Sequence, residues 1–271
     1  MKAHQVFAAD VHQVPPPFRA YAVRSDEARH AGLARAPWGQ VHRVQTTFLD
    51  AASRTGLAAQ GRAAAPVRGF SDINYARTSW PALAEAAPDV QDLPGHIAGA
   101  LQRTGVLGPT AGRYRRGVAT RIDYLTACGA GFHNDVARHW PRCLFWLLAL
   151  AVDDVEFVMP HAGLRLPLRP GDLLVFDQTM AHGLCRPADG GQAVATSFDA
   201  DAPQAQVFLT GELRLGDAQW AALGAPWLPL AEQARRGALD LRLAPFDERT
   251  GAIQRLGALR GCMQGMVPGR G

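Results

Sequence analysis

A series of short apolar segments in the middle of the chain constrains its fold more than any other feature. Each segment is four to nine residues long, and turn-forming glycine, proline and aspartate residues separate one from the next. Strands of this length at this spacing are typical of antiparallel sandwiches and barrels. We therefore expect a mainly β fold with helical flanks and a double-stranded β-helix (jelly-roll) core. The expected strands span residues 117–125, 143–150, 155–159, 163–168, 172–176, 193–198 and 206–209.

The segments on either side of these strands have a helical character. Alanine- and arginine-rich stretches predict helices over residues 25–35 and 47–62, and Asp92 is placed to cap a third helix over 93–103. Residues 64–80 contain proline, glycine and asparagine and predict a long loop. We expect a single domain, 1–271, with a mainly helical N-terminal flank (1–108), a jelly-roll core (109–215) and a C-terminal helical extension (216–271), including 231–241.

Two histidines and one aspartate in the core form a metal-ligand pattern. His133 and Asp135 are two residues apart, so on an extended segment their side chains point to the same side. His182 follows the tight turn Arg169–Asp172 and the strand 172–176, and a jelly roll can bring it close to the first pair. Two imidazoles and one carboxylate on one face of an ion are typical of non-haem Fe(II) oxygenases. The sequence therefore predicts an iron site whose ligands and catalytic residues are His133, Asp135 and His182.

Other residues compete for the ligand role. His139 stands beside a tryptophan and a proline and is expected in a loop or lid, while His161 is expected in a hairpin turn. A cupin-like barrel that binds a metal or small ligand without oxidative chemistry is the main alternative class. Such sites generally use an H-x-H pair and a downstream glutamate, whereas position 135 is aspartate and the nearby glutamate is Glu156.

Over residues 115–213 the chain resembles the Fe(II)/2-oxoglutarate-dependent dioxygenase superfamily. The segments that carry the resemblance are Gly131–Asp135, Gly171–Phe176 and Ala181–Gly183. The resemblance implies a jelly-roll core that holds ferrous iron and uses O2 and 2-oxoglutarate. It also implies that oxidative decarboxylation of 2-oxoglutarate to succinate and carbon dioxide is coupled to hydroxylation, or a related C–H oxidation, of a small-molecule substrate.

The chain departs from this family where the far carboxylate of 2-oxoglutarate is usually bound. No arginine or lysine lies in Gln192–Asp199, where such a residue is expected. An arginine would suit the task because its fork matches a carboxylate. The candidates, in order, are Arg186, Arg142 and Arg121. The departure leaves open an iron oxygenase that does not use 2-oxoglutarate.

Further polar and aromatic side chains are candidates for the co-substrate and substrate sites. Tyr124 and Gln192 are expected to add hydrogen bonds near 2-oxoglutarate, together with Thr196 and Ser197. The residues expected to contact the substrate come from three places, namely a segment near His139, the end of a core strand and the 64–80 loop; they are Trp140, Asp177, Asn74, Tyr75 and Arg77.

The composition bears on the possible binding partners of the protein and on its cellular location. The formal charge of +4 comes from arginines scattered along the chain, so no concentrated basic stripe indicates a nucleic-acid partner. A nucleic-acid demethylase of the same superfamily is therefore a minor alternative. We expect a cytoplasmic protein, because no signal peptide or membrane span is seen in the sequence and its widely spaced cysteines suit reduced, packed thiols. The tryptophan-bearing tail could pack on a second copy in a homodimer.

Overall fold

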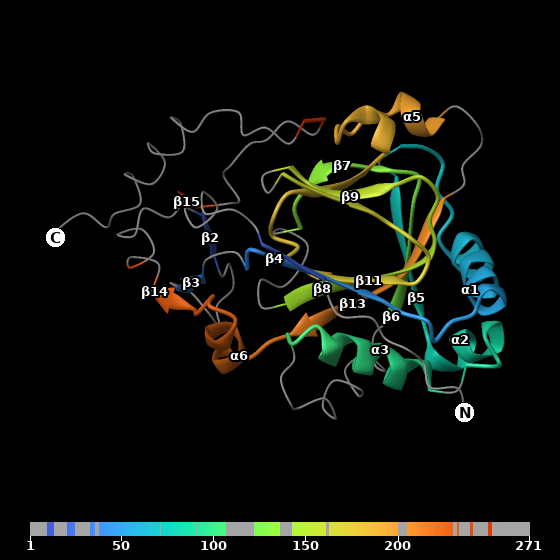
Figure 1. The fold of residues 1–271 in the computed structure, drawn as a ribbon, viewed down its shortest axis with the longest axis horizontal. Coiled ribbons are helices and arrows are strands. Elements are labelled where there is room, and N and C mark those ends of the chain that lie inside the picture. Colours follow the sequence, from blue (N-terminus) through green and yellow to red (C-terminus); the bar gives the residue numbers. More distant parts are fainter. Residues whose placement is uncertain are drawn as a thin grey trace.

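The computed structural model describes the core of the chain and several shorter segments. These are residues 10–13, 21–24, 33–35, 38–70, 72–90, 92–106, 122–135, 143–160, 163–199, 205–229, 232, 239–240 and 249–250. Figure 1 shows two facing sheets, with helices α1 to α3 on the far side of one of them. Both large sheets are antiparallel, and together they form the expected jelly-roll core with helical flanks.

The larger sheet has seven strands in the order β1-β4-β11-β8-β13-β6-β5. Their bounds are β1 Asp10–Gln13, β4 Gln40–Gln45, β5 Ile73–Thr78, β6 Ile122–Ala127, β8 Cys143–Ala151, β11 Asp172–Phe176 and β13 Gln206–Arg214. The facing sheet has the order β10-β9-β12-β7, with β7 Ala130–His133, β9 Glu156–Met159, β10 Leu164–Pro167 and β12 His182–Cys185. A third, small sheet joins β14 Leu228–Pro229, β3 Leu33–Arg35, β2 Tyr21–Arg24 and β15 Leu239–Asp240.

Strand β8 divides the apolar core into two layers. Because strand side chains alternate, Trp146 and Leu148 face one side and Phe145 and Leu147 face the other. The first pair packs in one cluster with residues of the helices α1 (Ala51–Ala64), α2 (Trp80–Ala86) and α3 (Leu93–Arg103). The second pair packs between the two sheets with Phe157 of β9. The larger sheet is therefore buried on both faces, which explains why β8 is one continuous apolar run.

Most of the predicted core elements are confirmed. Strands β8, β9, β10, β11 and β13 lie where they were expected, and β6 overlaps the expected segment 117–125, whose first five residues lie outside the described part. The helix over 93–103 is confirmed as α3, and the Asp92 side chain accepts a hydrogen bond from the Gly95 N–H at its start. Helix α1 begins four residues later than the expected 47.

Three predictions of secondary structure are wrong. The expected loop over 64–80 contains strand β5, because its backbone pairs with the edge of β6 along its whole length. The last three residues of the expected helix over 25–35 form strand β3, which pairs with β2 and β14. Within 1–108, the described residues form both the helices α1 to α3 and the strands β1 to β5. Residues Thr196–Asp199 form the short helix α5, not part of a strand over 193–198.

The C-terminal extension is helical only in part. Helix α6 spans Asp217–Ala222 and buries Trp220, whereas Leu239–Asp240 of the expected helix 231–241 pair with β2. Within the described part of the chain, every helix is too short or too polar to cross a bilayer. The described cysteines Cys128, Cys143 and Cys185 are buried and form no disulfide with one another, as expected for packed thiols. Burial raises the pKa of Cys143 and of Cys185 to about 12, so both stay protonated at neutral pH.

The turn before β11 depends on Gly171. Its φ is +93°, and a Cβ at this position would lie 2.7 Å from the Thr46 carbonyl oxygen and 2.7 Å from Gln45 Nε2. The Gly171 carbonyl oxygen also accepts hydrogen bonds from the Thr46 N–H and hydroxyl. The predicted Arg169–Asp172 turn is confirmed, because the Asp172 N–H donates to the Arg169 carbonyl oxygen at 3.0 Å.

We expect Gly171→Ala to lower the free energy of unfolding by about 2 kcal/mol or more, because it adds a clash to the cost of a left-handed backbone. Urea denaturation measures the change. Gly190→Ala is the matched control, since Gly190 has a φ of 64° and a Cβ added there would meet no atom within 4 Å, and it should cost only about 1 kcal/mol. Equal losses for both variants would contradict the close approach at Gly171.

Candidate metal centre

The two histidines come from neighbouring strands of the smaller sheet. His133 ends β7 and His182 begins β12, and the antiparallel pairing of these strands places the two residues directly opposite one another. Asp135 follows β7, and its N–H donates to the Gln178 carbonyl oxygen at 3.0 Å. That bond ties the segment after β7 to the turn that leads into β12. All three side chains are thereby brought to one end of the space between the sheets.

The ligand atoms of the three side chains converge. One nitrogen from each histidine and one Asp135 carboxylate oxygen all lie within 4.8 Å of one another. His182 Nε2 is 3.7 Å from Asp135 Oδ2, and the two imidazole rings are 4.5 Å apart between centroids. Asp135 and His182 are buried, and His133 is half-buried. The sequence prediction that these residues meet is confirmed.

Backbone carbonyl groups orient both imidazoles. His133 Nδ1 lies 2.8 Å from the Gly131 carbonyl oxygen, and His182 Nδ1 lies 2.8 Å from that of Met180. A carbonyl oxygen only accepts, so each Nδ1 carries the proton and each Nε2 keeps a lone pair. Metal-binding histidines are held in the same way by a hydrogen bond from the second ring nitrogen.

This donor set fits a divalent first-row metal ion. Two imidazole nitrogens and a carboxylate suit Fe(II), with bonds of about 2.0–2.2 Å in comparable sites. Ligand atoms within 4.8 Å of one another need only a small side-chain adjustment to share one ion. Glu156, which a cupin-like site would use, instead accepts a hydrogen bond from Arg165 Nε at 2.7 Å. The three residues leave the rest of an octahedral coordination sphere for other ligands.

Aromatic side chains and one glycine shape the surroundings of His182. Its ring packs against Phe176 and Phe157, with centroid distances of 5.0 Å and 5.9 Å. A Cβ on Gly183 would lie 2.7 Å from the Ala130 carbonyl oxygen and 3.0 Å from the Phe132 ring. Any larger residue after His182 would push β12 away from β7 and separate the two histidines.

A buried ion pair holds the turn between β11 and His182. Arg35 donates from Nη1 to Asp177 Oδ2 at 2.6 Å and from Nη2 to Oδ1 at 3.2 Å, and both side chains have 0% exposure. The carboxylate also accepts from the Trp38 N–H, the Thr179 N–H and the Thr179 hydroxyl. The Arg35 guanidinium lies 3.9 Å from the centroid of the Trp220 ring. No local pattern in the sequence indicates a role for Arg35, because its partner is 142 positions away.

Asp177 was expected to contact substrate, and the structure uses it for this ion pair instead. Burial by itself would raise the pKa of Asp177, but the Arg35 charge and the hydrogen bonds that the carboxylate accepts outweigh it and lower the pKa. The carboxylate is therefore ionised at neutral pH and fully engaged. Asp177 is the first residue of the turn that leads to His182. In that turn, the Gln178 carbonyl oxygen accepts from the Asp135 N–H, and the Met180 carbonyl oxygen accepts from His182 Nδ1.

None of the described co-substrate candidates, Arg186, Tyr124 and Gln192, lines the cavity that His133 and His182 share. Arg186 donates to the carbonyl oxygens of Asp153 and Asp154 at 2.7 Å and 3.0 Å, beyond the far end of β12. Tyr124 faces helix α1, where its hydroxyl donates to Gln60 Oε1 at 2.5 Å and burial raises its pKa. Gln192 is exposed. Arg142 and Arg121 lie outside the described residues.

Two of these positions, those of Tyr124 and Arg186, follow from strand geometry. Tyr124 and Leu125 are adjacent in β6, so their side chains point to opposite faces of the sheet. Tyr124 packs in the cluster that faces the helices, and Leu125 packs in the cluster between the sheets. Arg186 follows β12 by one residue, and that strand runs away from His182. Ser197 lies in helix α5, where its hydroxyl donates to Asp189 Oδ1 at 2.7 Å.

Of the residues expected to contact substrate, Tyr75 lies beside the histidines, whereas Asn74 and Arg77 do not line the same cavity. Tyr75 lines a cavity that also touches His133 and His182, and it is 43% exposed. Asn74 donates through its side-chain amide to the Pro66 carbonyl oxygen and does not line that cavity. Arg77 is exposed and pairs across strands with Asp123. Trp140 lies outside the described residues. A contact with substrate stays a prediction for Tyr75.

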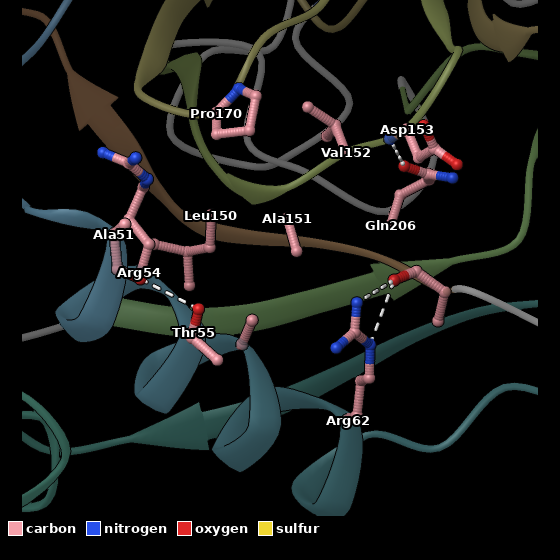
Figure 2. Close-up of a pocket in the computed structure, with 12 residues that line it drawn as sticks. Ala51, Arg54, Thr55, Arg62, Leu150, Ala151, Val152, Asp153, Pro170 and Gln206 are labelled. Atoms are coloured by element: carbon pink, nitrogen blue, oxygen red, sulfur yellow. Dashed lines mark hydrogen bonds between the residues drawn. The ribbon is translucent and has the colours of Figure 1, made fainter.

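A larger cavity lies elsewhere, between α1 and the ends of β8 and β13. Its volume is about 280 Å³, and none of the three metal-ligand candidates lines it. Figure 2 shows Arg54 and Arg62 on its helical wall, and both are already engaged. Arg54 donates to the Leu49 carbonyl oxygen at 2.6 Å, and Arg62 donates to that of Ala205 at 3.3 Å. The larger cavity is therefore not the metal centre.

Comparison with known families and with curated proteins finds no match. Several solved structures of 2-oxoglutarate and Fe(II) oxygenases are similar in fold. A viral collagen prolyl hydroxylase from Paramecium bursaria Chlorella virus-1, solved with 2-oxoglutarate, has a TM-score of 0.38 and 8% identity, with 65% of this chain and 96% of that chain covered. A Pseudomonas putida prolyl-4-hydroxylase has a TM-score of 0.35 and 16% identity, covering 68% and 93%. An α-ketoglutarate-dependent epimerase from nogalamycin biosynthesis has a TM-score of 0.36 and 15% identity, covering 83% and 91%.

Removing one partner of the Arg35–Asp177 pair should be costly. We expect Asp177→Asn to lower the free energy of unfolding by about 3–5 kcal/mol at pH 7, because it leaves a buried guanidinium without its counter-charge. The folded pKa of Asp177 is depressed, so the contribution of the pair is complete above the unfolded value of about 3.9 and is lost as the pH falls through the folded pKa. Urea denaturation from pH 7 to pH 3 should show the difference between wild type and variant shrinking with acid. A difference that stays constant with pH would contradict the ion pair.

Proposed function

We propose that this protein is a non-haem iron oxygenase in which His133, Asp135 and His182 bind Fe(II). The observation that carries the proposal is the convergence of one nitrogen from each histidine and one carboxylate oxygen within 4.8 Å, at one end of a jelly roll. A facial set of three protein ligands is what oxygen-activating iron sites use, because it leaves positions for dioxygen and a co-substrate. The proposed reaction is hydroxylation, or a related C–H oxidation, of a small molecule.

The protein residues contribute orientation and exclusion of water. When bound, ferrous iron supplies the coordination and activation of dioxygen. The Gly131 and Met180 carbonyl groups keep the Nδ1 protons in place, so that both imidazoles present Nε2 to the ion. Phe157 and Phe176 cover the His182 ring, and the apolar walls beside it keep bulk water away from the reacting groups.

The co-substrate within this proposal is 2-oxoglutarate. A cation has to bind its far carboxylate, and Arg142 and Arg121 remain the candidates, since Arg186 is engaged with backbone carbonyl groups. None of the described residues that line the cavity beside the histidines carries a positive charge. That apolar lining favours a second candidate, an iron oxygenase that does not use 2-oxoglutarate.

The metal-binding half of the proposal is tested with histidine variants. We expect His133→Ala and His182→Ala to weaken Fe(II) or Co(II) binding by more than about 100-fold, since even indirect partners of metal ligands cost about 10–100-fold. Isothermal titration calorimetry under anaerobic conditions measures the affinity. His96→Ala is the control. His96 lies in helix α3 and stacks on Phe48, so the variant should leave the metal affinity unchanged. Tight binding by both ligand variants would refute the proposed centre.

The oxidative half is tested by the reaction itself. The iron-loaded protein should convert 2-oxoglutarate slowly to succinate in the presence of O2, and neither histidine variant should do so. Anaerobic addition of 2-oxoglutarate should produce a new visible absorption band of the Fe(II) protein. If that band is absent while oxygen is still consumed, the second candidate replaces the first. Metal binding without oxygen consumption under any condition would favour a cupin-like binding barrel.

A further inference from the structure

The cavity beside the two histidines has almost entirely apolar walls. Its sides are formed by Phe145, Phe157, Phe176 and Phe208, together with Leu125 and Leu147. All six side chains are buried between the two sheets. The histidine imidazoles and the Tyr75 hydroxyl are the only polar side-chain groups among the lining residues that the structure describes. A cavity of this kind offers no hydrogen-bond partners to water along its walls, so it is suited to an apolar occupant.

One end of the cavity lies at the metal ligands and the other at the edges of both sheets. His133 and His182 line it at the paired strands β7 and β12, while Ile73 and Tyr75 of the edge strand β5 line the outer end. Ala130, from the edge strand β7 of the facing sheet, also lines it. Because Tyr75 is 43% exposed and Ile73 is half-buried, the outer end is accessible from solvent.

The size of the cavity selects its occupant. Its volume of about 30 Å³ is room for two or three water-sized spheres at roughly 10–15 Å³ each. A dry cavity that binds benzene is on the order of 150 Å³. An aromatic or aliphatic substrate therefore does not fit without displacement of several phenylalanine rings, whereas a diatomic molecule does.

We propose that this cavity admits dioxygen at the β5 edge and holds it beside His133 and His182. Dioxygen is small and apolar, so it partitions from water into apolar space, and the cavity delivers it to the side of the ligand set that faces the interior of the barrel. The assignment deepens the proposed oxygenase function and rests on it. The role assigned to the apolar lining is the same whichever organic substrate is oxidised.

Krypton binding tests the cavity without any catalysis. Krypton is close to dioxygen in size, and in crystals of the full chain under krypton pressure its anomalous signal should appear between Phe176, Leu147 and His182. Ala127→Leu should remove the signal, because Ala127 lines the cavity and is fully buried. Ala149→Leu is the matched control, since Ala149 lies in the same apolar layer but does not line the cavity, and it should keep the signal. Absence of krypton from the unaltered protein overturns the proposal whatever the activity.

Oxygen kinetics test the delivery role. With the iron-loaded protein, Ala127→Leu should raise the KM for O2 at least threefold while leaving the anaerobic Fe(II) affinity unchanged, and Ala149→Leu should change neither. Equal KM values for O2 in the two variants, or benzene binding in the cavity of the unaltered protein, would overturn the assignment to dioxygen. Krypton bound at the predicted position in a protein that never consumes oxygen would instead refute the oxygenase function, so the two failures are distinguishable.

Discussion

The antiparallel pairing of β7 with β12 is the constraint on which the candidate centre depends. It sets His182 opposite His133, and the close approach of Gly183 to the Ala130 carbonyl oxygen keeps the two strands at pairing distance. The third ligand joins them because the Asp135 N–H bonds to the Gln178 carbonyl oxygen. The Arg35–Asp177 pair holds the beginning of that same turn. Backbone contacts and one buried ion pair therefore position all three candidate ligands.

The larger sheet supports this arrangement through its two apolar faces. Helices α1 to α3 pack against the outer face, and the inner face packs against the smaller sheet. Phenylalanine and leucine side chains fill most of that space and leave a small cavity with mainly apolar walls beside the histidines. The packing that stabilises the jelly roll is thus the same packing that keeps polar groups away from the ligand atoms on this side.

The features that sequence analysis predicted correctly have local signals. Strand β8 is a continuous apolar run, α3 has its Asp92 cap, and His133 and Asp135 share a side because they are two apart. The errors arise where a distant partner decides the outcome. Strand β5 is polar and forms because its backbone pairs with β6. Arg186, ranked first as the co-substrate anchor, is drawn to two carbonyl groups at the turn between β8 and β9.

By itself the sequence determined the class of fold and singled out the three candidate metal ligands, because alternation along a strand and the spacing of donor atoms are properties of short segments. Only the tertiary structure decided that Asp177 pairs with Arg35, that Tyr124 faces a helix, and that an apolar cavity ends at the histidines. These outcomes depend on which face of a sheet becomes covered and on contacts across more than a hundred positions. Burial and long-range pairing are set by the assembled core, and no short segment of the chain encodes them.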